Sequence, residues 1–248
     1  MIPKVIHYFW FGGNPIPPLV EKCIESWKHF MPDYEIKRWD ESNFDVHQFA
    51  YTHEAYLAKK WAYVSDYARM KVLYEEGGVY LDTDVELVKS LDSILVNGAF
   101  MACERKSNQP PYPGVNTGLG IAVEPGHPIY KAVLSYYENI HFEGASGGLT
   151  VVEHVTSVLI EHGLKPTSDM QVVKGITIYP PEYFCPFDKF NRIAITPKTV
   201  AIHHYAGTWI GKENQWKKII AKMLGPYITY AIVKLKAFLR NLKKKEKK

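Results

Sequence analysis

Two carboxylates one residue apart, Asp82 and Asp84, are the residues of this chain best suited to do chemistry. They follow the apolar run Val79-Tyr80-Leu81, which reads as a short strand after a break at Gly77-Gly78. Side chains two apart on an extended chain project the same way, so both carboxylates can meet one partner. Adjacent anions repel, and hard divalent cations prefer carboxylate oxygens and share them with phosphates. The pair predicts a metal-diphosphate site, with turn or capping aspartates as the structural alternative.

The elements before this pair predict an α/β fold. A strand over Val5–Trp10, a helix over Leu19–Phe30 and a strand over Tyr34–Trp39 form a βαβ pattern, which is typical of a parallel sheet. A long helix is expected from Glu54 to Glu76, with Gly77 as its C-terminal cap. The next strand would then deliver the aspartates to its carboxyl end, where open α/β sheets place ligands.

The elements after the pair are shorter. Apolar alternation and Pro/Gly breaks predict strands and helices that are interrupted by loops at Lys106–Gly114 and Gly144–Gly148. The strands are expected at Phe100–Ala102, Asn116–Val123, Ile176–Tyr179 and Thr199–His203, and the helices at Pro128–Asn139 and Val151–His162.

Composition bounds the class of protein. At 248 residues and 46% hydrophobic content, the chain can bury one substantial core. The formal net charge of +4 hides an asymmetry, because Lys234–Lys248 holds eight Lys or Arg and one Glu while the rest is mildly acidic. A nucleic-acid partner for the whole protein is therefore not expected.

The cysteines and the start of the chain favour a cytoplasmic location. Three widely spaced cysteines argue against a disulfide framework or a zinc cluster and suit a reducing compartment. The N-terminus begins at once with a strand-like run instead of a signal peptide, and no apolar stretch is long enough for a membrane span. We expect a cytoplasmic body, peripheral on the inner face of the membrane.

Three sequence blocks together form a wider pattern: Ile2–Trp10, Ser65–Asp84 with its Ser-Asp-Tyr-Ala-Arg and Gly-Gly-Val-Tyr-Leu-Asp-Thr-Asp runs, and Ile202–Trp209. In residues and in order they resemble glycosyltransferase family 32, the family with a DXD-containing sugar-binding region. This family includes bacterial capsular-polysaccharide transferases and yeast α-mannosyltransferases, and it is related to the glucosylating domains of large clostridial toxins. The last block lacks the full H-x-x-G-x-x-K-P-W form of family 8 relatives.

The resemblance implies a GT-A fold, a mostly parallel nucleotide-binding sheet flanked by helices, and a metal-dependent retaining transferase that uses a nucleotide-sugar donor. Asp84 would bind Mn²⁺ or Mg²⁺ directly, and Asp82 would reach the metal through water or contact ribose and sugar hydroxyls. Asp66 would accept hydrogen bonds from the donor sugar, and Arg69 would reach the sugar or the diphosphate. The alternative for Asp66 and Arg69 is an ion pair on the helix surface.

Five further residues are candidates for the predicted site, three of them beside a structural alternative. Trp10 would stack on the nucleobase or fill the core, and Trp209 would pack on the diphosphate or fill the core. Asn116 would contact the donor sugar or close a turn. His203 and His204 point to opposite faces of a strand, and the H-x-x-G spacing to Gly207 favours His204 as the metal ligand.

We expect a catalytic domain over residues 1–224 and a basic amphipathic tail over 225–248. Apolar residues of the tail recur at helical spacing and its lysines lie mostly elsewhere, which is typical of helices on anionic membranes. A helix packed on the domain is the alternative for this tail.

The expected activity is transfer of a sugar, from a UDP-sugar rather than GDP-mannose, to a saccharide acceptor, lipid-linked, in surface polysaccharide biosynthesis such as that of a capsule. Two other functions stay open. One is a Mg²⁺-dependent phosphohydrolase of haloacid-dehalogenase type, although Glu86 stands where its D-x-D-x-[TV] pattern needs Thr or Val. The other is a non-catalytic nucleotide-sugar-binding module on the membrane.

Overall fold

The structure is a computed structural model that describes residues 1–104, 113–144, 150–167, 169–188, 190 and 192–207. The first of two compact units, 1–186 with 196–206, holds the helices and strands described below. In the second unit, Phe187 and Ile193 form an antiparallel bridge and Asp188 pairs with Arg192 at 2.6 Å. The expected tail over 225–248, the Gly147–Gly148 loop and Trp209 lie outside the described residues, so the predicted domain boundary stays a prediction.

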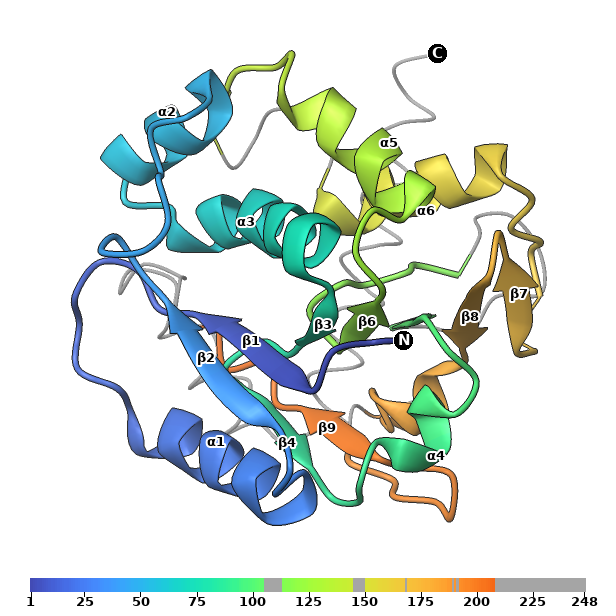
Figure 1. Cartoon of the computed structure of the whole chain (residues 1–248). Coiled ribbons are helices and arrows are strands. Elements are labelled where there is room, and N and C mark those ends of the chain that lie inside the picture. Colours follow the sequence, from blue (N-terminus) through green and yellow to red (C-terminus); the bar gives the residue numbers. More distant parts are fainter. Residues whose placement is uncertain (105–112, 145–149, 168, 189, 191, 208–248) are drawn as a thin grey trace, which may run out of the picture. The chain divides into compact units, whose positions relative to one another are not determined.

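A seven-stranded sheet runs through the middle of the first unit (Figure 1). Its order is β2-β1-β3-β6-β5-β8-β7, and β6 and β7 run opposite to the other five strands, so the sheet is mixed but mostly parallel. The strands are β1 (Val5–Phe9), β2 (Glu35–Trp39), β3 (Gly78–Tyr80), β5 (Phe100–Ala102), β6 (Ile121–Val123), β7 (Gln171–Val173) and β8 (Ile176–Tyr179). The expected α/β class is confirmed.

A second, two-stranded sheet lies beside the first and pairs segments that are far apart in the sequence. In it β4 (Val85–Leu87) runs antiparallel to β9 (Ala201–His203), with Val85 opposite His203. β4 was not predicted from the sequence, because three residues directly after a turn carry no periodic pattern. This small sheet decides which late residues reach the aspartates.

Helices cover both faces of the main sheet (Figure 1). On one side, α3 (Trp61–Glu76) packs against β1, β3 and β6, and α2 (Ala50–Leu57) and α5 (Pro128–Tyr137) pack on α3. Next to α5 lies α6 (Val151–Glu161), and the other face carries α1 (Pro18–Phe30). The short α4 (Asp92–Leu95) and a 3₁₀ turn (Pro181–Tyr183) complete the described elements.

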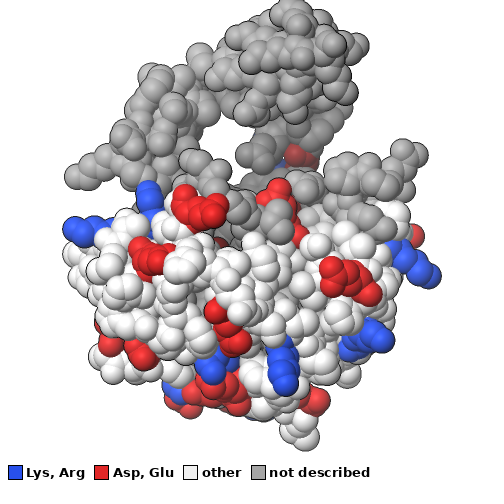
Figure 2. Space-filling model, turned by 90° about the horizontal axis from the view of Figure 1, so that it is seen from above, with Lys and Arg blue, Asp and Glu red and all other residues white. Residues whose placement is uncertain are grey.

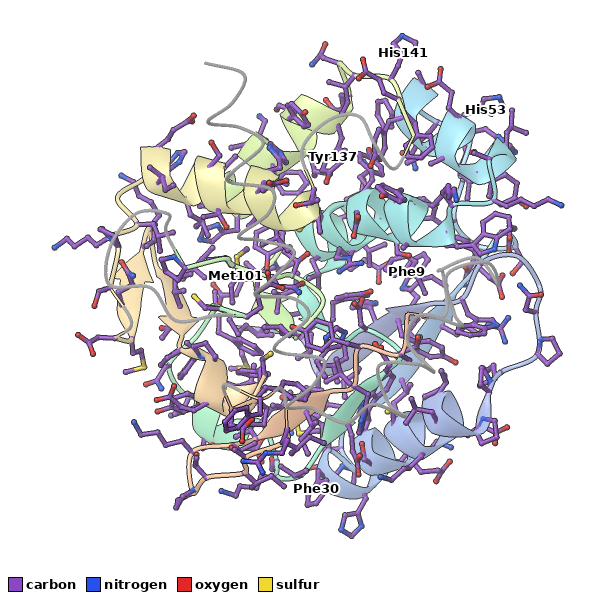
Figure 3. All side chains as sticks on the ribbon, turned by 180° about the vertical axis from the view of Figure 1, so that it is seen from behind. Phe9, Phe30, His53, Met101, Tyr137 and His141 are labelled. Atoms are coloured by element: carbon purple, nitrogen blue, oxygen red, sulfur yellow. The ribbon has the colours of Figure 1, made fainter. Side chains whose placement is uncertain are left out.

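The core lies between the sheet and the α2, α3, α5 and α6 helices. Phe9, Met101 and Tyr137 are buried in it, whereas His53 and His141 lie at its outer edge (Figure 3). On the described part of the face seen in Figure 2, Lys and Arg side chains stand apart from one another among Asp and Glu. Within the described residues, no helix has both the length and the apolarity that a membrane crossing requires.

The helix expected over Glu54–Glu76 is two helices. The first ends where Lys59 adopts a left-handed backbone, φ 56°. The Lys60 amide donates to the Ala55 carbonyl and the Lys59 amide to the Tyr56 carbonyl, both at 2.9 Å, which is the Schellman pattern of a helix C-terminus. The helical prediction was correct in type and wrong in continuity, because lysine rarely adopts this conformation and gives no signal for it.

Candidate active site

Asp82 and Asp84 lie on the turn that leads from one sheet into the other. The Asp82 amide donates to the Gly118 carbonyl at 3.4 Å, just beyond the end of β3, and the Val85 amide closes the turn on the Asp82 carbonyl at 2.9 Å. Asp82 therefore belongs to the rim of the main sheet, and Asp84 leads into β4. Two separate packing environments hold two carboxylates that are neighbours in sequence.

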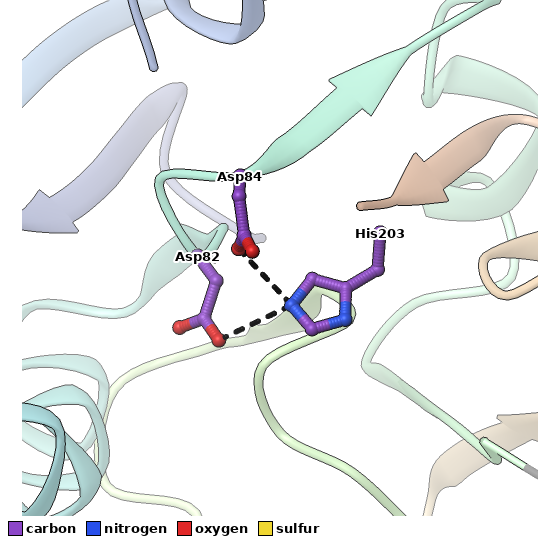
Figure 4. A group of neighbouring side chains, drawn as sticks. All are labelled: Asp82, Asp84 and His203. Atoms are coloured by element: carbon purple, nitrogen blue, oxygen red, sulfur yellow. Dashed lines mark ion pairs between the residues drawn. The ribbon is translucent and has the colours of Figure 1, made fainter. Parts of the chain in front are cut away.

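His203 brings the third donor to this pair (Figure 4). Its position opposite Val85 in the small sheet places its Nε2 3.1 Å from Asp84 Oδ1 and 3.6 Å from Asp82 Oδ2. One donor atom from each of the three residues lies within 4.8 Å of the others. His203 is the last residue of the strand expected at Thr199–His203, which was the available signal for its role.

The structure places His203 beside the aspartates, and not His204, which the sequence had favoured as the metal ligand. The Nε2 of His204 is 2.8 Å from Glu86 Oε2, which also pairs with Lys22 Nζ at 2.8 Å. The two histidines have different partners, Asp84 for His203 and Glu86 for His204, and the H-x-x-G spacing favoured the one that lies away from the aspartates. The alignment of β9 on β4 decides which histidine faces the aspartates, and the histidine sequence alone contains no information about it.

The three side chains fit a divalent cation. Burial alone would lower the pKa of His203, but its contacts with Asp82 and Asp84 raise it to about 9, so a proton on this imidazole balances the carboxylates in the metal-free protein. Two carboxylate oxygens and one imidazole nitrogen are donors that Mn²⁺ accepts, whereas Mg²⁺ favours oxygen alone. His203 Nδ1 is buried and has no hydrogen-bond partner among the described residues.

Backbone groups of the returning chain hold Asp84. The Ala206 amide donates to Asp84 Oδ2 at 2.7 Å, and the His204 amide donates to the Asp84 carbonyl at 2.9 Å. Side chains of α1 cover the other edge of β4, where Trp27 Nε1 donates to the Val85 carbonyl at 2.7 Å. The second carboxylate is thus fixed largely through main-chain contacts.

Arg69 holds Asp82 from the opposite side. Its guanidinium, with only 5% of the side chain exposed, lies 2.9 Å from Asp66 Oδ1 and 3.3 Å from Asp82 Oδ1. It also lies over the Tyr80 ring at 4.7 Å, and the Tyr80 hydroxyl donates to Asp82. Arg69 is a buried counter-ion between two carboxylates, so the structure places it behind the site instead of on its surface.

Asp66 and Asp82 both pair with Arg69, but the pKa values of the two carboxyl groups are shifted in opposite directions. Burial raises the pKa of Asp66 to about 6, with Arg69 opposing and Asp82 adding to the shift. Burial would also raise the pKa of Asp82, but Arg69 and His203 hold it below its ordinary value. Asp82 is therefore ionised at neutral pH, and Asp66 is the more easily protonated of the two.

Two other predicted residues lie on loops. Trp10 follows β1 and is half-buried, and its Nε1 donates to the Asn14 carbonyl at 2.7 Å. It is outside the buried core, which disfavours core packing as its role. Asn116 lies on a turn beside Asp82, and its Oδ1 accepts from the Gly118 amide at 2.8 Å. Three groups that contact an aspartate of the pair were not predicted from the sequence: the Tyr80 hydroxyl, Gly118 and the Ala206 amide.

Comparisons with known proteins agree with this site. Residues 17–101 match the family model described as "Glycosyltransferase sugar-binding region containing DXD motif". This span includes Asp66, Arg69 and both aspartates of the turn.

Two named relatives are similar over different lengths. "Uncharacterized glycosyltransferase L373" of Acanthamoeba polyphaga mimivirus is 23% identical over 205 residues, covering 75% of this chain and 78% of that protein. "Inositol phosphoceramide mannosyltransferase 3" of Schizosaccharomyces pombe is 33% identical over 100 residues, covering 38% of this chain and 27% of that protein.

Solved structures show a partial likeness. The PaToxG glycosyltransferase is 22% identical, with a TM-score of 0.48 over 64% of this chain and 69% of that one. A glycosyltransferase involved in glycosylation of the major capsid of PBCV-1 is 14% identical, with a TM-score of 0.48 over 83% of this chain and 95% of that one. The sequence matches and the aspartate site lead to one identification: the chain is a glycosyltransferase whose residues 17–101 match a DXD-containing sugar-binding region.

Proposed function

We propose that this glycosyltransferase is a metal-dependent, retaining enzyme that moves a sugar from a nucleotide-sugar to a saccharide acceptor. The observation that supports it most is the convergence of Asp82, Asp84 and His203 from two separate sheets on one point. Bringing together two like charges is unfavourable unless a cation accompanies them. Such an arrangement has a clear use in binding a diphosphate through a shared metal.

The residues present divide the work of holding the donor. Asp82, Asp84 and His203 would bind Mn²⁺, which when bound offsets the negative charge that grows on the departing nucleoside diphosphate. Asp66 pairs with Arg69 and is 13% exposed, and its carboxylate would accept hydrogen bonds from the hydroxyls of the donor sugar. Trp10, half-buried after β1, offers an aromatic face to the nucleobase. Arg69 keeps two of these carboxylates in place.

Retention by front-face attack remains our proposal for the stereochemistry. Each carboxylate described at the site is already held by a partner: Asp66 and Asp82 by Arg69, and Asp84 by His203 and Ala206. A double-displacement mechanism needs a carboxylate free to attack the anomeric carbon. A covalent sugar trapped on an enzyme carboxylate would overturn the front-face proposal.

The donor and acceptor are proposed from different sources. A UDP-sugar is preferred because many bacterial members of the resembled family use UDP donors. The fission-yeast relative is named for mannosyl transfer to inositol phosphoceramide, so GDP-mannose must be tested beside UDP-sugars. That name also supports a lipid-linked acceptor. Surface polysaccharide biosynthesis, including capsule formation, is the proposed setting.

A cytoplasmic, membrane-peripheral location is proposed from the basic, amphipathic pattern of residues 225–248. Binding of the full chain to anionic and to neutral vesicles, with and without residues 226–248, tests this location. We expect sedimentation with anionic vesicles only, and only with the tail present. Equal binding of the truncated chain would contradict the proposal.

A panel of nucleotide sugars with Mn²⁺ tests the activity itself. We expect one donor to release nucleoside diphosphate and to raise the thermal midpoint, and Asp84→Asn to remove both responses because the amide lacks the charge that binds metal. Asp33→Asn, at an exposed position, is the matched control. Metal-dependent stabilisation without diphosphate release would indicate the binding module, and phosphate release from a phosphomonoester would indicate the hydrolase.

A further inference from the structure

The turn Asn116–Gly118 lies against Asp82, next to the Oδ2 atom of its carboxylate. The turn lies next to the last residue of β5, because the Asn116 amide donates to the Ala102 carbonyl at 3.0 Å. Along the chain, the turn leads into β6. The Gly118 carbonyl accepts the Asp82 amide at 3.4 Å. Gly118 lies against this carboxylate, Thr117 contacts its counter-ion Arg69, and Asn116 closes the turn that holds the other two residues.

Asn116 uses both ends of its amide inside the protein. Its Oδ1 accepts from the Gly118 amide at 2.8 Å, which is the Asx-turn pattern, and its Nδ2 donates to Glu104 Oε2 at 3.0 Å. A side chain that closes its own turn and ties it to a neighbouring strand end acts as a brace. This engagement favours the turn alternative of the sequence analysis over a donor-sugar contact.

Gly118 is required for space and not for backbone conformation. A Cβ added there would overlap Asp82 Oδ2 and lie 3.0 Å from Asp82 Cγ and 3.1 Å from Asn116 Oδ1. The φ of Gly118 is not positive, so an alanine would meet no left-handed strain. The hydrogen atom of this glycine is what allows the Asp82 carboxylate to lie where it does.

Thr117 extends the contact to the counter-ion. It is fully buried, and its Oγ1 accepts from Arg69 Nη1 at 3.4 Å. Arg69 in turn pairs with Asp82 Oδ1, whereas Gly118 lies next to Asp82 Oδ2. The carboxylate is thus confined between the turn and the guanidinium, with the Tyr80 hydroxyl as a further partner.

We propose that the Asn116–Gly118 turn is a positioning element that sets the orientation of the Asp82 carboxylate toward the cation, with Asn116 as a brace and not a sugar ligand. This inference rests on the proposed metal-dependent function. It concerns three residues that do not donate to the metal themselves. Outer partners that orient metal ligands typically change metal affinity about 10- to 100-fold when they are removed.

Mn²⁺ binding measured by calorimetry or electron paramagnetic resonance, without donor, is the first test. We expect Gly118→Ala and Asn116→Ala each to raise the Mn²⁺ dissociation constant about tenfold, and Asn116→Ser to recover part of the loss because serine also closes such turns. Gly98→Ala, where no atom lies near the added Cβ but φ is +82°, controls for instability alone and should bind Mn²⁺ normally. A role as sugar ligand predicts the opposite for Asn116→Ala, normal Mn²⁺ affinity and a raised donor KM, and that result would overturn the inference.

A double-variant cycle in metal-free protein separates this inference from the proposed function. Gly118→Ala should lower the denaturant midpoint in the wild-type background, and it should lose that effect when Asp82→Ala has removed the overlapping atoms. Equal destabilisation in both backgrounds would contradict the positioning role. If the wild type binds Mn²⁺ but transfers no sugar, the proposed function fails while a positive cycle leaves the turn's role standing.

Discussion

The two aspartates of one turn are held in different ways. Asp82 lies among side chains, with Arg69, Tyr80 and the bare Cα of Gly118 around its carboxylate. Asp84 is fixed mainly by the main chain of the segment that follows β9, through the Ala206 and His204 amides. His203 is the one described side chain that contacts both. The position of Asp82 should therefore respond to side-chain substitution, and that of Asp84 to changes in backbone.

The largest expected effect concerns Asp82, the aspartate that is held by side chains. Arg69→Met should leave Asp66 and Asp82 buried without their counter-ion, at a cost of about 3–5 kcal/mol in the free energy of unfolding. Chemical denaturation measures it, and Arg69→Lys should recover only part because lysine cannot span both carboxylates as a planar fork. Stability near that of the wild type would mean that Arg69 does not compensate these charges.

His203, which contacts both aspartates, predicts that stability and Mn²⁺ affinity change with pH in opposite directions. The pKa of His203 is raised from 6.5 to about 9, so its ion pairs stabilise metal-free protein fully below pH 6.5 and are lost as the pH rises through 9. Mn²⁺ must displace this proton, so its affinity should rise about tenfold per unit between pH 7 and pH 8.5. Calorimetry at fixed ionic strength measures the slope, and His203→Gln should flatten it. A flat wild-type profile would contradict the assignment.

The main-chain contacts that hold Asp84 are tested by removing one backbone amide. Ala206→Pro eliminates the donor to Asp84 Oδ2, and a hydrogen bond to a charged group contributes about 1.5–3 kcal/mol. We expect Mn²⁺ affinity to fall more than tenfold, with some added destabilisation because Tyr205, at φ 48°, precedes the proline. Ala206→Ser keeps the amide and should behave as the wild type. Normal Mn²⁺ binding by Ala206→Pro would show that Asp84 is not held in this way.

The smallest expected effect separates the two histidines. His204→Gln removes a half-buried partner of Glu86, which keeps its pair with Lys22, so stability should change by about 1 kcal/mol or less. Its Mn²⁺ affinity should stay within about twofold of the wild type, whereas His203→Gln should lose 10-fold or more because a ligand is gone. Equal losses in the two variants would remove the distinction that the structure draws between them.

The sequence predicted much of this site and missed how it is assembled. The break at Gly77, the strand before the aspartates and the Asp66–Arg69 spacing on a helix are local patterns, and the structure contains all three. The burial of Arg69 between Asp66 and Asp82 could not be predicted, because helical spacing shows only which residues share a face and not how deeply that face is buried. The division of the long helix at Lys59 also escaped prediction, because the residue type opposes the conformation.

What the sequence determined by itself is the chemistry. It contains two carboxylates at a strand end, the oppositely charged Asp66 and Arg69 one helical turn apart, and the spacing of a sugar-binding region. What only the tertiary structure decided is which distant groups complete the site. His203 reaches Asp84 because β9 pairs with β4, more than a hundred residues earlier in the chain, and Gly118 reaches Asp82 because β6 lies beside β3. Pairing between distant strands depends on the packing of the whole fold, so it cannot be predicted from a local pattern of residues.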